Sequence, residues 1–292
     1  MKVGLQINRF NFPGGDRAIA KRLRSIAQAA EKAGFDDLWV MDHFFQIRYI
    51  GPKTDPMLES YTTLGFLAGV TERVKLGTLV TGVIYREPAV LIKAVTALDV
   101  LSGGRAYLGI GAGWNDEEAI ALGLTDPLHS KRFERLEDTL KLAHQMWSGN
   151  TKPFKGTHYQ LPEPINHPKA ITKPHPPILI GGGGEQKTLK LVAQYADACN
   201  LFYRAGEEDV KHKLEVLRGH CQDVGRNYDE IEKTISAGSS VAQFTSESEV
   251  ALAKARSIKD LGFSHLILSV GTEDDLSVYG KSKAVIGQIH QM

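Results

Sequence analysis

The sequence has 292 residues, and its 35 lysine and arginine side chains nearly balance its 34 aspartates and glutamates, leaving a formal net charge of +1. This balance argues against nucleic-acid-binding proteins and polybasic membrane proteins, which carry clustered positive charge. No stretch approaches the roughly 18 uninterrupted apolar residues of a membrane helix, and the first residues lack a signal-peptide pattern. With two cysteines and no CxxC spacing, we expect a cytoplasmic protein.

Eight apolar or β-branched segments are predicted to be strands, and helical patterns alternate with them along the chain. This alternation predicts βα units around a parallel sheet. Several of the segments are almost continuously apolar, which is typical of strands covered on both faces. The predicted strands are 2–8, 37–42, 74–82, 105–111, 177–182, 198–202, 231–244 and 265–270.

Two helices are predicted from apolar residues at helical spacing. The first spans 17–33 and ends at Gly34, which stands where a helix C-cap glycine is expected. The second spans 131–147 and carries one apolar face. Both helices are therefore expected to pack on the sheet.

Two long segments interrupt the alternation, 43–58 with 16 residues and 148–176 with 29. Long loops in compact domains usually carry function or move. Without them 247 residues remain, close to the roughly 250 of an eight-fold barrel. The sequence therefore predicts an α/β protein with one domain over residues 1–292, a (β/α)8 TIM barrel with two insertion segments.

Two glycine-rich stretches are candidates for binding a phosphate group. The stretch Gly109–Trp114 does not match the dinucleotide fingerprint, because Trp114 takes the place of the third glycine. Four consecutive glycines, Gly181–Gly184, lie between a predicted strand and a helix expected to begin near Glu185, with Lys187 nearby. Backbone amides at such a junction can bind an anion, so we expect a phosphate cradle, with a tight turn as the alternative.

The pair Asp42-His43 stands at the C-terminal end of the second predicted strand, where barrel enzymes place their active sites. A histidine there can accept or donate a proton near neutral pH. Adjacent strand residues point to opposite faces, so Asp42 need not contact the imidazole. A structural loop histidine is the alternative interpretation.

Five short motifs follow one another along the chain. They are Asp42-His43-Phe44, Leu76–Thr81, Arg86-Glu87-Pro88 before a helix predicted at 94–101, Ser102–Arg105 and Leu108–Gly113. Together they resemble the luciferase-like flavin and deazaflavin oxidoreductases, and among these the coenzyme F420-dependent branch. The resemblance covers nearly the whole chain. It implies a (β/α)8 barrel with a cofactor bound at the C-terminal mouth.

The resemblance also implies roles for individual residues. His43 and Asp42 would be catalytic, beside the reactive edge of the cofactor ring. A bulge with a non-prolyl cis peptide, somewhere in 79–82, would back that ring, and glycine amides would bind the cofactor phosphate. The implied cofactor-binding residues are Leu79, Val80, Thr81, Gly82, Gly111, Gly113, Gly182, Gly183 and Gly184.

One stretch departs from the sugar-phosphate dehydrogenases of that branch. They carry a catalytic acid just after the glycines of the fourth strand, where this chain has Trp114-Asn115. A sugar-phosphate substrate is therefore not expected. Asn8, Glu59 and Trp114 are candidates for substrate contact, although Glu59 could instead be a carboxylate at a helix N-terminus.

The resemblance favours an oxidoreductase that uses coenzyme F420 and a small-molecule substrate, with a possible homodimer and no nucleic-acid, membrane or metal partner. A monooxygenase that uses reduced FMN is the alternative. A metal-dependent barrel hydrolase is less favoured, because none of the ten histidines forms an HxH or HExxH motif. A protein that binds flavin without catalysis is the remaining hypothesis.

Overall fold

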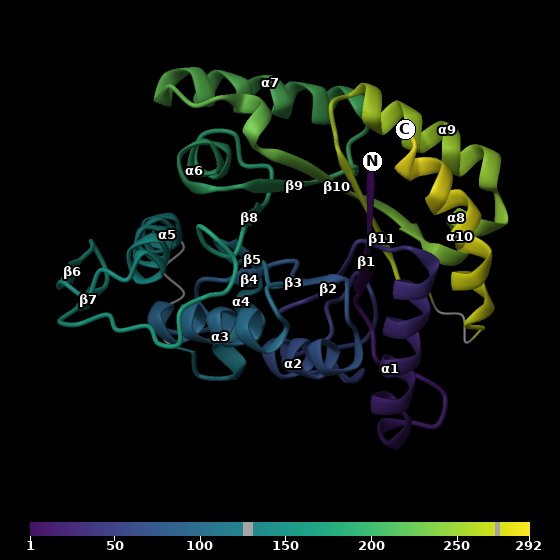
Figure 1. The fold of residues 1–292 in the computed structure, drawn as a ribbon, viewed down its shortest axis with the longest axis horizontal. Coiled ribbons are helices and arrows are strands. Elements are labelled where there is room, and N and C mark those ends of the chain that lie inside the picture. Colours follow the sequence, from purple (N-terminus) through teal and green to yellow (C-terminus); the bar gives the residue numbers. More distant parts are fainter. Residues whose placement is uncertain (125–130, 272–274) are drawn as a thin grey trace.

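The predicted barrel is confirmed in a computed structural model, which describes residues 1–124, 131–271 and 275–292 (Figure 1). Nine strand segments form one sheet in the order β3-β2-β1-β11-β10-β9-β8-β5-β4. Every pairing along this order is parallel, as βα units require. The bounds are β1 (Lys2–Ile7), β2 (Asp37–Val40), β3 (Lys75–Thr78), β4 (Thr81–Gly82), β5 (Leu108–Gly111), β8 (Ile178–Gly181), β9 (Ala198–Phe202), β10 (Glu232–Ser240) and β11 (His265–Ser269).

The two ends of this sheet, β3 and β4, are successive pieces of the third predicted strand. The chain leaves the sheet between them, at a cis peptide bond between Leu79 and Val80, inside the stretch expected to hold one. β3 pairs with β2, whereas β4 pairs with β5. A further bridge joins Leu76 to Ala106, so the sheet closes into an eight-fold barrel.

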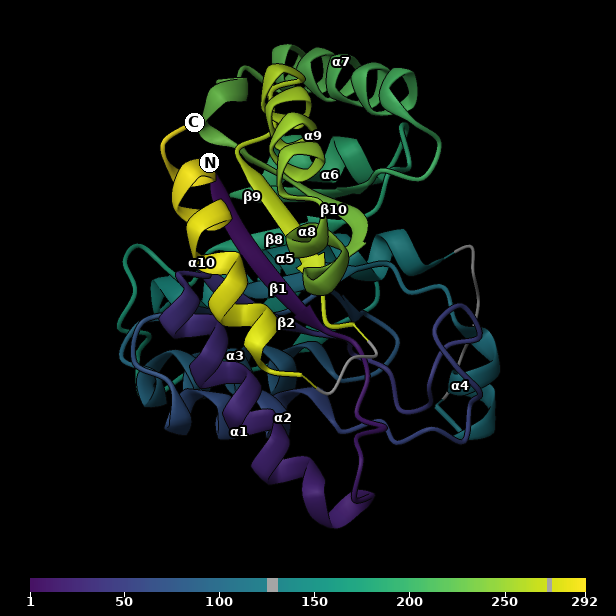
Figure 2. The same ribbon diagram turned by 90° about the vertical axis from the view of Figure 1, so that its right-hand side faces the viewer.

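Helices surround the sheet on the outside (Figures 1 and 2). The two chain ends lie close together in both views, and the amino group of Met1 donates a hydrogen bond to the Ile289 carbonyl at 3.0 Å. Across the described ranges, no helix is long and apolar enough to cross a membrane. The helix bounds are α1 (Asp16–Ala33), α2 (Ser60–Val70), α3 (Pro88–Leu101), α4 (Asp116–Ala121), α5 (Arg132–Ser148), α6 (Thr188–Tyr195), α7 (Glu207–Val224), η2 (Tyr228–Glu230), α8 (Val241–Ser246), α9 (Ser248–Asp260) and α10 (Ser277–His290).

The first helix shows how the sequence pattern becomes packing. Its apolar positions Ile19, Leu23 and Ile26 are all buried, and burying each such side chain contributes about 1.5–3 kcal/mol. Gly34 ends α1 in the left-handed conformation, with φ 102°, as the C-cap prediction requires. The position of α1 against the sheet therefore follows from local pattern and capping.

Several predicted boundaries were wrong. The strand predicted at 231–244 ends at Ser240, because the Ser240 side chain caps the next helix and exchanges bonds with Gln243 in a capping box. The helix predicted at 94–101 begins at Pro88, since proline is favoured in the first helical turn. The helix expected near Glu185 begins at Thr188. The strand predicted at 105–111 begins at Leu108, and the segment 148–176 includes a hairpin of β6 (Phe154–Lys155) and β7 (Gln160–Leu161).

Inside the barrel, a small apolar layer separates the two ends. Trp39, Leu179, Ala198 and Ile267 pack there with Leu79. Gly77 makes room for the indole, because a Cβ at that position would lie 2.7 Å from the Trp39 ring. All strands run in one direction, so the loops after their C-terminal ends meet at one mouth. The predicted site residues belong to these loops.

Candidate active site

A cavity of about 370 Å³ opens at the C-terminal mouth of the barrel. Backbone and side chains from the loops after five strands border it, and most of its lining is apolar or glycine. Ten predicted site residues line it: His43, Leu79, Val80, Gly82, Gly111, Gly113, Trp114, Gly182, Gly183 and Gly184. The remaining lining residues are Tyr85, Ala112, Phe133, Gly181, Thr188, Asn200 and Phe202. The fold thus brings together motifs that are up to 141 positions apart in the sequence.

Four predicted site residues lie outside this lining. The Asp42 carboxylate is buried behind the cavity and bound by Arg86. The buried Thr81 hydroxyl contacts those of Thr78 and Tyr61, each at 3.0 Å. Glu59 is the N-cap of α2, where its Oε2 accepts from the Thr62 N–H at 2.7 Å.

Asn8 follows β1 at the mouth. Its carbonyl accepts a hydrogen bond from the Gln46 side chain at 3.1 Å. Its side-chain Oδ1 is buried and has no hydrogen-bond partner among the residues that the structure describes. A buried acceptor of this kind is costly unless a donor reaches it. Asn8 does not line the cavity, so substrate contact by its side chain stays a prediction.

One wall of the cavity is made of backbone and of the side chain of Val80. A Cβ at Gly181 would lie 2.9 Å from Val80, and one at Gly111 would lie 3.0 Å from it. Only glycine allows this close approach without displacing its neighbour. The wall is therefore free of side chains at two neighbouring strands, which suits contact with a flat ring system.

The glycine run at the end of β8 leaves amide groups available. The Gly182 N–H donates to the Asn200 carbonyl at 3.1 Å. The N–H groups of Gly183 and Gly184 have no acceptor within the described part of the chain. The Lys213 side chain lies against Gly183, where an added Cβ would be 2.7 Å from its Cε. Free amides beside a cation fit a phosphate group.

Lys187, the cation expected near the cradle, has its Nζ 5.3 Å from the ring centroid of Phe133, which lines the cavity. Lys213 comes from α7 and also forms an ion pair with Asp209. Lys213 therefore lies against the glycine run, and Lys187 lies against an aromatic residue of the lining. Only Lys187 was expected from the sequence.

His43 is held by a carboxylate, and that carboxylate is Glu118. The His43 Nδ1 lies 2.8 Å from the Glu118 Oε2, and their side chains are 11% and 1% exposed. Nδ1 must donate to an ionised carboxylate, so the neutral ring carries its proton on Nδ1 and leaves Nε2 as an acceptor. Nε2 has no partner among the residues described here, and His43 lines the cavity.

Glu118 is itself surrounded by donors. The N–H groups of Phe44 and Phe45 donate to its Oε1, the latter at 2.9 Å. The Tyr85 hydroxyl and the Asn115 amide donate to its Oε2, at 2.9 and 3.2 Å. Burial would raise the pKa of Glu118, but these bonds and His43 lower it below its usual value. The carboxylate is therefore ionised and fixed in place.

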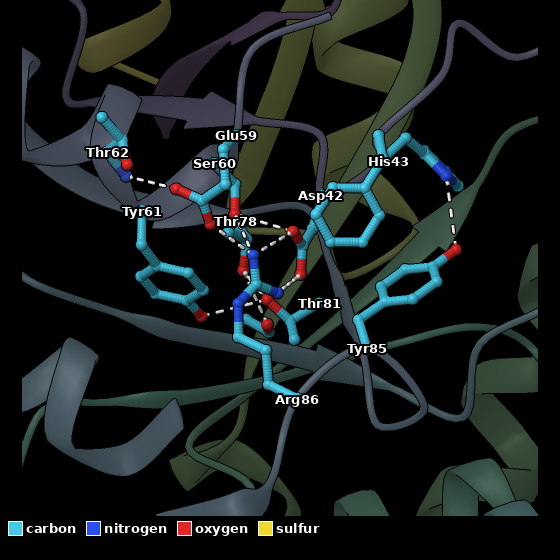
Figure 3. Close-up of polar contacts among 12 residues, drawn as sticks. Asp42, His43, Glu59, Ser60, Tyr61, Thr62, Thr78, Thr81, Tyr85 and Arg86 are labelled. Carbon is cyan, nitrogen blue, oxygen red and sulfur yellow. Dashed lines mark hydrogen bonds and ion pairs between the residues drawn. The ribbon is translucent and has the colours of Figure 1, made fainter. Parts of the chain in front are cut away.

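Asp42 belongs to a second network behind the histidine (Figure 3). The Arg86 guanidinium donates to its two oxygens, at 2.6 and 3.0 Å, and the Ser60 hydroxyl donates at 2.7 Å. Arg86 also contacts Glu59, at 2.5 Å. Burial opposes the charge of Arg86, yet Asp42 and Glu59 raise the pKa of its guanidinium. This network joins the end of β2 to the start of α2.

Sequence reasoning missed Glu118, Lys213 and Arg86. A signal for Glu118 existed, because the acidic run Asp116–Glu118 directly follows a strand end at the mouth. No local signal marked Lys213, which reaches Gly183 from α7, 30 positions further along the chain. Within the described ranges, no group of three His, Cys, Asp or Glu side chains is arranged to hold a metal ion.

Comparisons with known proteins agree with this architecture. A family model described as luciferase-like monooxygenase matches residues 1–285. The F420-dependent glucose-6-phosphate dehydrogenase of Kineococcus radiotolerans is 31% identical over 237 residues, which are 80% of this chain and 66% of that protein. The protein of the same name from Nakamurella multipartita is 32% identical over 72% of this chain and 60% of its own length. The chain thus matches about two thirds or less of these relatives' length.

Solved structures share the fold at lower identity. An F420-dependent secondary alcohol dehydrogenase in complex with an F420-acetone adduct superposes with a TM-score of 0.81 at 17% identity, covering 99% of this chain and 98% of its own. A monooxygenase from Streptomyces bottropensis gives 0.74, also at 17%, covering 100% and 98%. At this identity the likeness concerns the fold alone.

Proposed function

Because this chain belongs to the luciferase-like monooxygenase family, we propose that it is an oxidoreductase that transfers a hydride between coenzyme F420 and a small organic substrate. One observation carries the proposal: His43, fixed by Glu118, faces a cavity that has a flat wall at one side and free glycine amides at one end. Curated relatives with this cofactor in their names support it.

The cavity fits the cofactor. When bound, coenzyme F420 would supply the carbon that gives or takes the hydride. Leu79 and Val80, with the glycines of β5 and β8, would hold its flat ring. The amides of Gly183 and Gly184, together with Lys213, would hold its phosphate.

We assign proton transfer to His43. Its Nε2 is free to take a proton from a substrate hydroxyl, or to return one to a carbonyl oxygen when the hydride moves the other way. Glu118 keeps the proton of the resting ring on Nδ1 and stabilises the imidazolium that forms. A group that holds its orientation in this way does not reorganise during the reaction.

We assign Asp42 a positioning role. Both of its oxygens are taken by Arg86 and Ser60, and its side chain is 1% exposed. Asp42 precedes His43 in the chain, so its anchoring fixes the backbone from which the imidazole projects. Glu59 acts in the same network through Arg86 and the cap of α2. Trp114 and Asn8 remain our candidates for substrate contact.

A monooxygenase that uses reduced FMN is the second candidate function. The same flat wall and phosphate cradle would fit FMN, and the fold is shared with a monooxygenase. Titration of the purified chain with each cofactor decides between the two. We expect coenzyme F420 to quench the emission of Trp114, which lines the cavity, and Trp114→Phe to remove that signal. Tight FMN binding without any response to coenzyme F420 would overturn the proposal.

Gly183→Val tests the phosphate cradle. The added side chain would meet Lys213 and block the Gly183 amide, so we expect cofactor affinity to fall about 10- to 100-fold, as for the loss of a charged hydrogen bond. Gly280→Val is the matched control, because nothing lies within 4 Å of a Cβ at that exposed position. Isothermal titration measures the affinity. Loss of folding in Gly183→Val alone would favour the tight-turn interpretation.

We also propose a cytoplasmic location and a homodimeric assembly. A sedimentation experiment on the purified chain tests the second point. The location fits the two buried thiols, Cys199 and Cys221, which carry no disulfide.

A further inference from the structure

Five exposed side chains gather beside the active-site cavity, and we call them the mouth cluster: Arg48, Tyr49, Trp114, Phe202 and Arg204. They come from the segments that follow β2 and β5, from the last residue of β9 and from the segment after it. The ring centroids of Tyr49 and Trp114 are 6.2 Å apart, and that of Trp114 is 5.5 Å from His43. The cluster thus starts at the proposed proton-transfer residue and extends outward.

The aromatic members are unusually open to solvent. Tyr49 is 63% exposed, Trp114 52% and Phe202 42%. Exposed apolar side chains that gather in one place mark binding sites more often than scattered ones do. Trp114 also borders a second cavity, of about 580 Å³, which Arg48 and Lys53 line. Trp114 therefore borders both the cofactor cavity and a larger one, whose lining carries two basic and two acidic side chains.

Two guanidinium groups converge on a single ring in this cluster. The Arg48 Cζ lies 4.9 Å from the Tyr49 ring centroid and the Arg204 Cζ lies 5.8 Å from it, while Arg204 is also 4.8 Å from Phe202. Arg48 donates to the Tyr49 hydroxyl at 2.9 Å. Within residues 1–124, 131–271 and 275–292, neither guanidinium has a carboxylate within 4 Å.

Each acid that lines the second cavity already has a partner, and that of Glu118 is His43. Glu117 pairs with Lys53 at 3.1 Å, and both side chains are exposed. Two like charges beside one ring repel each other, and a bound anion would relieve that repulsion. Arginine suits carboxylates in particular, because its planar fork can donate two parallel hydrogen bonds.

We propose that the mouth cluster binds the carboxylate of the substrate, and that the substrate is a planar organic acid. This inference rests on the proposed function. Arg48 and Arg204 hold the carboxylate, and the planar body packs on the exposed rings of Trp114 and Tyr49. The opposite end of the molecule then points past Trp114 toward His43. The substrate class is therefore aromatic or conjugated carboxylic acids with a hydroxyl or carbonyl at the far end.

Calorimetric titration of the full chain with benzoate, and with its neutral isostere benzamide, tests this site. We expect benzoate to bind at least tenfold more tightly than benzamide. Arg48→Gln and Arg204→Gln should each remove most of that preference, because each deletes a charge-assisted donor. Arg256→Gln, an exposed arginine on α9, is the matched control and should change nothing.

The same variants show whether the two arginines bind an anionic group of the substrate or one of the cofactor. Coenzyme F420 should bind the two arginine variants with unchanged affinity. If the variants weaken coenzyme F420 and leave benzoate unaffected, the arginines serve the cofactor and the inference is wrong. Equal binding of benzamide and benzoate would overturn it as well.

Failure here and failure of the proposed function give different results. Binding of coenzyme F420 without any charge preference among the benzene derivatives would reject the planar-acid substrate and leave the F420 proposal standing. Binding of benzoate with the expected arginine dependence, but no binding of coenzyme F420, would reject the cofactor and support the anion site. Trp114→Phe retains an aromatic face and should preserve the benzoate preference, whereas Trp114→Ala should weaken both ligands.

Discussion

The two ends of the barrel each place a histidine against carboxylates, yet they differ in what they leave free. At the C-terminal mouth, the His43 Nδ1 is bound to Glu118, while its Nε2 has no partner among the residues described and His43 lines the cavity. At the N-terminal end, the His265 Nε2 lies 3.0 Å from Asp37 and its Nδ1 lies 3.3 Å from Glu232. The side chain of His265 is 3% exposed, so each nitrogen is sealed from water at ion-pair distance from a carboxylate, although neither makes a well-directed hydrogen bond to the residues described.

Other groups complete the cluster around His265. Lys2 pairs with Glu232 at 2.8 Å, and the Trp39 N–H donates to Asp37. Burial would lower the pKa of His265, but Asp37 and Glu232 raise it to about 9. Burial would raise the pKa of Glu232, but His265 and Lys2 lower it to about 2. His265 and Glu232 are therefore both charged at neutral pH.

The comparison teaches that residue type alone does not separate a catalytic histidine from a structural one. Both sites are buried and rich in carboxylates, which are features of functional and structural ion networks alike. The difference is one unoccupied nitrogen that faces a cavity. Exchange of protons with a substrate requires that nitrogen, so we expect chemistry at His43 and stability at His265.

His43→Ala should produce the largest effect. Removing the proposed general acid or base should slow turnover about 10²- to 10⁴-fold, with little change in the free energy of unfolding. Steady-state kinetics with saturating cofactor, together with urea unfolding, measures both quantities. Unchanged turnover with cofactor bound would reject the role of His43.

His265→Leu should lower the free energy of unfolding and leave the active site intact. It leaves Asp37 and Glu232 buried without their shared cation, a change that costs about 3–5 kcal/mol of unfolding free energy. Cofactor affinity of the folded protein should stay the same, because the apolar layer around Trp39 separates this end from the mouth. Urea unfolding and cofactor titration check the two parts. Loss of cofactor affinity in folded protein would contradict the separation of the ends.

Glu118→Gln should have an intermediate effect. The amide can still accept from the Phe45 N–H, but it no longer stabilises an imidazolium at His43. We expect turnover to fall about 10- to 100-fold, as for a lost charged hydrogen bond, and the pH profile of turnover to change. Cofactor affinity serves as the control. A merely structural glutamate would alter stability without altering the pH profile.

The pH dependence of stability should give the smallest effect. Folding raises the pKa of His265 from 6.5 to about 9, so its contribution to stability is full below about pH 6.5 and is lost as the pH rises through about 9. We expect the melting temperature to fall by a few degrees between pH 7 and 10. Thermal melts of His265→Leu should lack this decline. An identical decline in the variant would assign it to other groups.

Local sequence patterns determined much of the fold. The apolar stripe of α1, the glycine that ends it and the alternation of strands with helices each depend on neighbouring residues, and they sufficed to predict the barrel. Motif order also placed His43, Trp114 and the glycines of β5 and β8 at one mouth, because parallel strands end together. Element boundaries that depend on a capping side chain, as at Ser240, were predicted less accurately from the sequence.

Only the tertiary structure decided which partners these residues have. The sequence pairs Asp42 with His43, but both lie beyond the end of β2 at Val40, and Glu118 reaches the imidazole from 75 positions away. Asp42 binds Arg86 instead, 44 positions away. Such contacts depend on how distant elements pack, and no local spacing encodes them. The near-neutral charge of the whole chain likewise gave no indication that Arg48 and Arg204 would meet at one ring in the mouth cluster.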